Sequence, residues 1–351
     1  MSEGVLSTRA LNRALLARQL LLERAKLPVT DALEAVGGLQ TQYAPSGYIG
    51  LWSRLRDFRR DALTTALQER RAVQATLMRS TIHMVSAADY PLMTAAVRTA
   101  RREWWLRAER GQLDDVVMRE VAQLVRRRLA EGPARHSEMV ELVEAAGFPR
   151  RTWSGAGMWL DMVRVPPSGT WERRRADLYG LADDWLGPAE VSEADGISLL
   201  IRRYLGGFGP APLRDLANWA GLRVKAVEAA AAQLGLRFFR DEAGGELLDL
   251  PDAPLPEPDT AAPVRLLPTW DAILLAHARR AGILAEEHRG RVFSTKMPQS
   301  VCTFLVDGAV AGIWRYDSGR VRLEPFARLG AAVRRELEDE AERLAAFHAD
   351  G

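Results

Sequence analysis

The sequence contains very little of several residue types on which common protein chemistries depend. Of its 351 residues only Cys302 is a cysteine, which excludes an internal disulfide and fits a reducing compartment such as the cytoplasm. The 5 histidines form no cluster with metal-ligand spacing, so we expect no metal ion and no cofactor. No apolar run is long enough to cross a bilayer, and the first residues are polar and then amphipathic. We therefore expect neither a membrane anchor nor a signal peptide.

Lysine is also scarce, so arginine supplies nearly all of the positive charge. Lysine occurs only at Lys26, Lys225 and Lys296, and the formal net charge is +2. A GC-rich genome favours arginine codons and explains this bias without function. Arginine is also the better ligand for phosphate, and a nearly neutral total can hide a basic groove because acidic segments offset basic ones elsewhere. The contents of 47% hydrophobic and 27% charged residues are typical of a globular protein with a real core.

A pattern of helices and hairpins recurs along the chain. Residues 124–147 and 200–221 each show a helix that ends in Arg-Arg, a Gly-Pro-Ala break and a second helix that ends in Ala-Gly. Pro133 and Pro210 stop the first helix, because proline lacks the amide hydrogen and crowds the preceding turn. A third helix and a hairpin follow in each copy, with predicted turns at residues 167–169 and 243–245. Short helices followed by a two-stranded wing are typical of a winged helix.

The two ends of the chain complete the predicted organisation. The N-terminal part fits the same pattern, with amphipathic helices followed by a strand pair at residues 72–85. A proline-rich acidic stretch then precedes three strands at residues 300–326 and a charged C-terminal helix. We predict an α+β fold, mainly α, with three tandem winged-helix modules and a small C-terminal β-barrel-like domain. The boundaries are 1–110, 111–187 and 188–250 for the modules, 251–265 for the linker and 266–351 for the last domain.

Six stretches of the sequence match one known family in order. They are GLQTQYAPS, LMRSTIHMVSAADYP, PPSGTWERR, GPAPLRDLANWAGL, LPTWDAILLAHARR and TFLVDGAVAGIW. From about residue 5 to 325 the chain resembles the bacterial winged-helix DNA glycosylases of the AlkZ/YcaQ family. The resemblance implies a C-shaped molecule whose concave surface binds DNA. The family signature is glutamine, one residue, then glutamine or aspartate, and here it falls on Gln40-Thr41-Gln42, as in the AlkZ-like branch.

The resemblance implies that Gln40 and Gln42 are the catalytic residues of a monofunctional DNA glycosylase. Neither amide exchanges a proton usefully near neutral pH, so the implied substrates are purines that alkylation has made cationic, such as N7-alkylguanine and N3-alkyladenine. We expect Gln42 to orient water and Gln40 to contact the sugar or the adduct. Bulky natural-product adducts and interstrand crosslinks are further expected substrates, in base excision repair or antibiotic self-resistance. The expected partner is double-stranded DNA with alkylated purines, bound by a cytoplasmic, nucleoid-associated monomer.

Eight further residues are candidate DNA contacts: Arg79, His83, Arg164, Arg173, Arg174, His277, Arg279 and Lys296. A structural hydrogen bond at a strand edge explains Arg79 and His83 equally well, and a solvated wing explains the arginines of the second hairpin. Asp271 and His277 either pair with each other beside the active site or make separate hydrogen bonds between domains. Nothing near Lys296 would lower its pKa toward Schiff-base chemistry, so strand scission is not expected.

Two other functions fit part of the sequence. A transcription regulator is the main alternative, because winged helices are frequent in such proteins, but a regulator usually has one module, a dimerisation helix and an effector domain. A protein that sequesters an alkylating drug would not need the glutamine pair. Three modules and a β domain in one chain favour a monomer that wraps around DNA.

Overall fold

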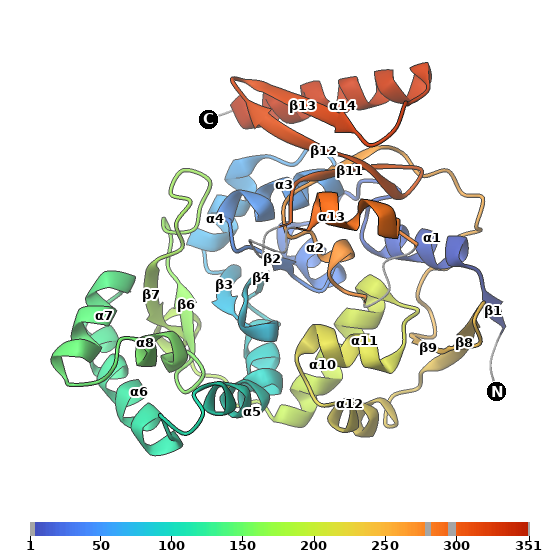
Figure 1. The fold of residues 1–351 in the computed structure, drawn as a ribbon. Coiled ribbons are helices and arrows are strands. Elements are labelled where there is room, and N and C mark those ends of the chain that lie inside the picture. The colour runs from blue at the N-terminus through green and yellow to red at the C-terminus, as the bar shows by residue number, and fades with distance from the viewer. Residues whose placement is uncertain (1–3, 278–281, 294–299, 350–351) are drawn as a thin grey trace.

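The computed structural model describes residues 4–277, 282–293 and 300–349. Figure 1 shows helices grouped around three separate sheets, with the second module at the lower left and the C-terminal hairpin and helix at the top. In the part of the chain that is described, no helix is long and apolar enough to cross a membrane.

The segment predicted as the first module, residues 1–110, carries the glutamine pair. Its elements are β1 (Val5–Leu6), α1 (Thr8–Arg18), α2 (Val29–Ala35), β2 (Leu39–Gln40), α3 (Ala44–Arg54), α4 (Arg60–Gln68), β3 (Ala72–Thr76), the 3₁₀ turn η1 (Met78–Ser80), β4 (Ile82–Ser86) and α5 (Tyr90–Ala108). β3 and β4 pair antiparallel, as the alternation of residues 72–85 predicts. Gly47 and Gly50 give α3 a low helix propensity, whereas Pro45 lies in its first turn, where proline is tolerated. All 11 residues of α3 are buried, so tertiary packing stabilises it instead.

The second module continues the sheet of the first. It contains α6 (Asp115–Ala130), β5 (Ala134–Arg135), α7 (His136–Ala145), α8 (Arg151–Ala156), β6 (Met162–Arg164), β7 (Leu178–Leu181) and α9 (Ala182–Leu186). The combined sheet has the order β2-β4-β3-β6-β7-β5, and β3 meets β6 where Gln74 lies opposite Arg164. β6 and β7 pair as predicted, but residues 165–177 join them as a long loop rather than a short turn at 167–169.

The third module packs closely against the first. It contains α10 (Glu193–Phe208), α11 (Leu213–Ala220), α12 (Val224–Ala231), β8 (Arg237–Asp241) and β9 (Glu246–Asp249). β8 and β9 form the predicted hairpin, and β1 adds to β8 as a parallel strand. Gly196 allows α10 to approach α5, since a Cβ there would collide with the carbonyl oxygen of Leu92.

The proline-rich linker is fixed to α1, although it has no regular structure. Arg9, Arg13 and Arg18 each donate a hydrogen bond to a backbone carbonyl between residues 254 and 260, at 2.7, 2.7 and 3.0 Å. The stretch that composition predicts to be extended is therefore held against α1 by hydrogen bonds and is not a free linker.

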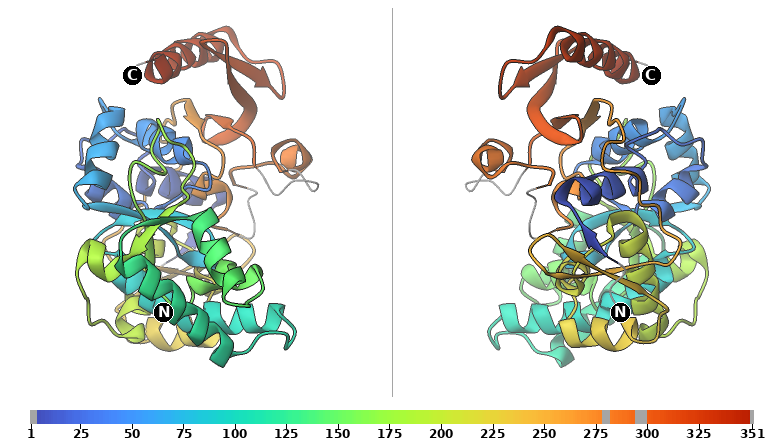
Figure 2. Two further views of the ribbon diagram at one scale, coloured as in Figure 1. Left: turned by 90° about the vertical axis from the view of Figure 1, so that its left-hand side faces the viewer. Right: turned by 90° about the vertical axis from the view of Figure 1, so that its right-hand side faces the viewer.

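The C-terminal domain is an open sheet and not the predicted β-barrel-like domain. It contains β10 (Arg265–Leu267), the 3₁₀ turns η2 (Ala272–Leu274) and η3 (Glu286–His288), α13 (Arg289–Val292), β11 (Thr303–Val306), β12 (Ala309–Asp317), β13 (Arg320–Pro325) and α14 (Ala331–Ala349). The strand order is β10-β11-β12-β13, and among the described residues β10 and β13 do not pair to close it. Figure 2 shows α14 lying along the β12–β13 hairpin. Four strands, one of them only 3 residues long, are too few to curl into a filled barrel.

Buried apolar residues join the modules unequally. One core contains residues of the first and third modules together, including Tyr90, Met93, Leu200 and Tyr204. A second core joins α2, α3 and α4 to the C-terminal sheet and α14. The helices α6, α7 and α8 of the second module pack around a core of their own, whereas α9 packs against the first core. The glutamine pair thus lies in the module that both shared cores hold in place.

Candidate active site

The glutamine pair lies at the junction of a strand and a helix. Gln40 ends β2 opposite His83 of β4, and the amide of Thr41 continues this ladder by donating to the carbonyl of Ile82 at 2.8 Å. Tyr43 then precedes the first residue of α3. The preceding Gly37 and Gly38 have φ of 73° and 80°, and a Cβ on Gly38 would lie 2.8 Å from Val85. The glycine pair is thus required for β2 to lie against β4.

Both carboxamides face the connection between β3 and β4. The Oε1 atom of Gln40 accepts from the Arg79 guanidinium at 3.2 Å, and Oε1 of Gln42 accepts from the backbone amide of Ile82 at 2.6 Å. Gln42 thereby takes the place of the next backbone carbonyl in the ladder. A guanidinium and a backbone amide can only donate, so these contacts fix which end of each carboxamide is oxygen. Each NH₂ group has no hydrogen-bond partner among the described residues.

The two glutamines differ in exposure. Gln40 is 7% exposed, whereas Gln42 lies at the surface. Each carboxamide oxygen uses one lone pair on its protein donor, so its second lone pair can accept from water or substrate. The site therefore offers oriented neutral dipoles, one nearly buried and one open to solvent.

Arg79 joins Gln40 to the third module. Its guanidinium also donates to the carbonyl of Trp219 at 2.5 Å, which places α11 behind the site. Arg79 and Ser80 both have left-handed backbones, with φ of 50° and 56°, a costly conformation that persists only where the surroundings enforce it. Burial by neighbouring groups lowers the pKa of Arg79, although part of the residue remains open to solvent. Arg79 therefore lies at the site itself.

His83 is buried and neutral. It is 3% exposed, and its Nδ1 lies 3.0 Å from the carbonyl of Thr81. Burial, with the charge of Arg79 as the second cause, lowers the pKa of His83 to about 3. The ring is uncharged at neutral pH, so in this position it supports β4 and is not a cationic phosphate ligand.

The candidates of the second hairpin divide into two groups. Arg164 is buried, donates to the hydroxyl of Thr76 at 2.8 Å and stacks on Tyr179, so it joins β6 to β3. Arg173 and Arg174 are exposed on the long loop after β6. The long loop therefore exposes Arg173 and Arg174, whereas Arg164 lies inside the sheet.

Asp271 and His277 do not pair with each other. Asp271 accepts two hydrogen bonds, at 2.8 and 2.9 Å, from the buried Arg54 at the end of α3. His277 lies 3.3 Å from both Asp215 of α11 and the hydroxyl of Tyr204. Each residue thus makes its own contact between segments, which is the second of the two arrangements that the sequence allows. Arg279 and Lys296 lie outside the described residues.

Sequence reasoning missed one residue beside the pair. Tyr43 directly follows Gln42, is 44% exposed, and its hydroxyl accepts from Arg174 at 2.8 Å. An aromatic residue next to the signature was the available signal. Among the described residues, no three His, Cys, Asp or Glu side chains are grouped as metal ligands would be.

Comparisons with known proteins identify the family and the fold of the chain. The model of the protein family described as "DNA glycosylase AlkZ-like" matches residues 33–347. Among solved structures, the Streptomyces sahachiroi DNA glycosylase AlkZ is similar with a TM-score of 0.81 and 18% sequence identity, over 98% of this chain and 97% of that one. At that identity the likeness establishes the fold alone. No curated protein matches the chain.

Proposed function

The chain belongs to the AlkZ-like DNA glycosylase family, and from this premise we propose which lesions it removes and how. It is a DNA glycosylase, an enzyme that hydrolyses the N-glycosidic bond between a base and deoxyribose. We propose that its substrates are purines that alkylation has made cationic, namely N7-alkylguanine and N3-alkyladenine. Gln40 and Gln42 are the proposed catalytic residues. Membership of an enzyme family also excludes the alternative of a transcription regulator without catalysis.

One observation carries this proposal: among the described residues, no group that hydrogen-bonds to either glutamine carboxamide is a general acid. Within the described residues these groups are the Arg79 guanidinium and the Ile82 amide. Neither releases a proton near neutral pH, and the neighbouring His83 is uncharged there. A site of this kind cannot protonate a leaving base, so it suits a base that needs no proton.

The positive charge of an alkylated base removes the need for the general acid that the site lacks. A normal purine would leave with negative charge, and a general acid would be needed to neutralise it. A purine alkylated at N7 or N3 already carries positive charge, so it leaves as a neutral molecule when the C1′–N bond breaks. The remaining tasks are to stabilise oxocarbenium-like charge on the sugar and to hold one water molecule for attack. Oriented amide dipoles can do both without proton transfer.

The geometry supports a division of roles between the two residues. Gln42 is exposed, and its oxygen is held by Ile82 with one lone pair left over, so we assign it the attacking water. Gln40 is nearly buried and held by Arg79, so we assign its carboxamide to the sugar or the adduct. The exposure of Gln42 also supports action on bulky adducts or crosslinks, because such a lesion need not enter an enclosed pocket. We propose that the chain acts as a monomer, with its helical modules wrapped around the duplex.

Substrate charge gives the direct test of this mechanism. We expect the protein to release N7-methylguanine from duplex DNA and to leave uracil in place, because uracil would depart as an anion. Release is measured as alkali-labile abasic sites on a labelled strand. Strand breaks should appear only after alkali, since hydrolysis by water leaves the sugar–phosphate backbone intact. Uracil release at a comparable rate would mean that the site contains an acid, and the mechanism would then be wrong.

The values of kcat and KM for Arg79 variants distinguish a role in positioning Gln40 from a direct contact with DNA. We expect Arg79→Met to lower kcat about tenfold while KM stays nearly constant, because Gln40 loses a charge-assisted hydrogen bond. Arg79→Lys should recover part of kcat. Arg70→Met is the matched control, since Arg70 is also exposed, has φ of 62° and donates to a tryptophan carbonyl, but does not contact a glutamine. A higher KM with unchanged kcat would instead identify Arg79 as a phosphate ligand.

A further inference from the structure

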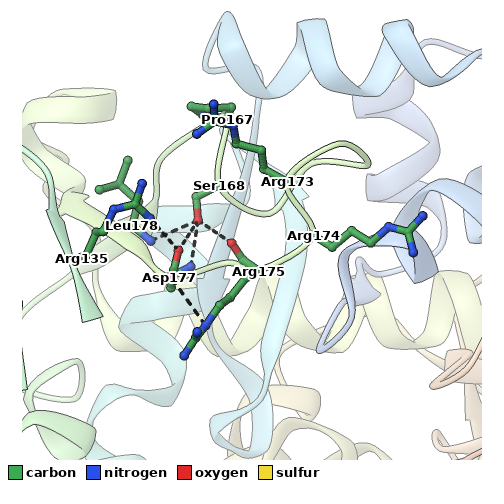
Figure 3. A pocket seen from close by; sticks show the side chains of 8 residues that line it. All are labelled: Arg135, Pro167, Ser168, Arg173, Arg174, Arg175, Asp177 and Leu178. Carbon is green, nitrogen blue, oxygen red and sulfur yellow. Dashed lines mark hydrogen bonds and ion pairs between the residues drawn. The ribbon is translucent and has the colours of Figure 1, made fainter. Parts of the chain in front are cut away.

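An arginine-lined pocket lies on the long loop between β6 and β7. It has a volume of about 330 Å³, and its lining residues are Arg135, Pro167, Ser168, Arg173, Arg174, Arg175, Asp177 and Leu178. Figure 3 shows Ser168 and Asp177 at its centre, with the side chain of Arg174 pointing away from both. Four arginines thus surround a pocket with a single carboxylate.

That carboxylate neutralises only part of the charge. Asp177 lies 3.5 Å from Arg135 and 3.4 Å from Arg175. Arg173 and Arg174 have no carboxylate partner among the described residues, and the side chain of Arg174 donates only to neutral oxygens. The pocket therefore keeps a surplus of positive charge with guanidinium donors available. This combination suits an anion with several oxygen acceptors, such as a phosphate.

The loop is built rigidly, unlike a solvated wing. The hydroxyl of Ser168, which is 7% exposed as a residue, accepts from the amides of Asp177 and Leu178 and donates to the carbonyl of Arg175. The amide of Gly169 donates to the carbonyl of Arg173 at 2.8 Å. These bonds fix the backbone of residues 173–175, so the arginine side chains start from a defined position.

The first module also holds this loop. The side-chain amide of the buried Gln74 donates to the carbonyl of Gly169 at 3.0 Å. Gly169 has φ of 78°, and a Cβ there would collide with the same glutamine. On the other side Arg174 donates to Tyr43, the residue after Gln42. The pocket is thus joined at two points to the module that carries the active site.

We propose that this pocket binds a backbone phosphate of the DNA duplex and so sets the position of the damaged nucleotide relative to Gln42. Arg173 is the main ligand of the phosphate. Arg174 aligns the pocket with the active site through its hydrogen bond to Tyr43. The proposal rests on the proposed function in that it names how the same active site holds its substrate. We favour a DNA phosphate as the bound anion, because the pocket is fixed to the catalytic module. Free inorganic phosphate would offer the pocket the same oxygen acceptors.

The test measures duplex binding by the full chain, without any base release. Fluorescence anisotropy over a salt series gives the slope of log Kobs against log[salt]. We expect Arg173→Gln to make this slope shallower by about 1, the value for one lost phosphate contact. Arg127→Gln is the matched control, since Arg127 is an exposed arginine of the same module that does not line the pocket. Equal slopes for the wild type and both variants would overturn the proposal, whether or not N7-methylguanine is released.

A second arm locates the phosphate and separates the two sources. Single phosphates near the lesion are replaced by neutral methylphosphonates, and we expect the wild type to lose about tenfold in affinity at one position. Arg173→Gln should lose nothing further at that position. Inorganic phosphate at constant ionic strength should leave the Tm of the wild type unchanged. A phosphate-dependent rise in Tm that Arg173→Gln abolishes, with no sensitive position in the DNA, would overturn the proposal in favour of a free-anion site.

Discussion

Gln42→Ala should lower the rate of N7-methylguanine release by about 10²–10³-fold, the effect of removing one oriented dipole from a reacting centre. Two consequences of the change add to each other. The attacking water loses its acceptor, and the amide of Ile82 loses the oxygen that occupies the next position of the β2–β4 ladder. Gln40→Ala should cause a loss of similar size, because the sugar or the adduct then loses the carboxamide that Arg79 holds in place. The rate is measured in single turnover with excess enzyme, which isolates the chemical step.

A graded set of variants distinguishes chemistry from damage to the fold. Gln42→Glu has the same length and still offers an oxygen to Ile82, so we expect it to keep a rate within about tenfold of the wild type. Gln123→Ala removes an exposed glutamine of α6 and should change nothing. The Tm of every variant is compared with that of the wild type, and we expect a change no larger than the loss of one hydrogen bond causes. A Gln42→Ala protein with the wild-type rate would show that the pair is not catalytic.

Local signals in the sequence predict the elements of the fold well. Proline breaks and glycine turns at Pro133, Pro210 and Gly244–Gly245 lie where helices end and where the third hairpin turns. The alternation of residues 72–85 predicts the strand pair that faces the two glutamines. These features depend on neighbouring residues only, so periodicity and turn chemistry are sufficient to find them.

Contacts between distant segments are what the sequence could not predict. The pairing of β3 with β6, and of β1 with β8, brings together strands far apart in the chain. The sequence of a strand contains no pattern that indicates which distant strand it pairs with. The expected barrel is absent because the three predicted strands gain only the short β10, and four strands are too few to close.

The candidate site shows the same limit. The signature located Gln40 and Gln42, but the bond from Arg79 to Gln40 depends on a left-handed turn that no local pattern indicates. Burial likewise decided the state of His83, which spacing alone left open. Residue types predict the chemistry of the candidate site, whereas tertiary packing determines the charge and the orientation of its members.

The buried pair of Arg54 and Asp271 should be a sensitive point of the scaffold. Both side chains are almost fully inaccessible, and Arg54 also donates to the side chain of Gln19 at 3.1 Å. Asp271→Ala leaves a buried guanidinium without a counter-charge, so we expect the free energy of unfolding to fall by about 3–5 kcal/mol. The change should also slow base release, because Arg54 ends the helix that begins just after Gln42 and Tyr43. Urea denaturation followed by circular dichroism measures the first effect.

An exposed pair in the same module provides the control. Glu23 and Arg56 lie 3.0 Å apart with both side chains mostly open to solvent, so Glu23→Ala should cost less than about 1 kcal/mol. Replacing both buried partners, as Arg54→Met with Asp271→Leu, should recover much of the stability that Asp271→Ala loses, because no charge then remains unpaired. If the double variant regains stability but not activity, then the ion pair also fixes the orientation of α3 at the glutamines. If Asp271→Ala costs no more than Glu23→Ala, then Arg54 reaches water in solution, and the packing of α3 against residues 269–271 is looser than the structure indicates.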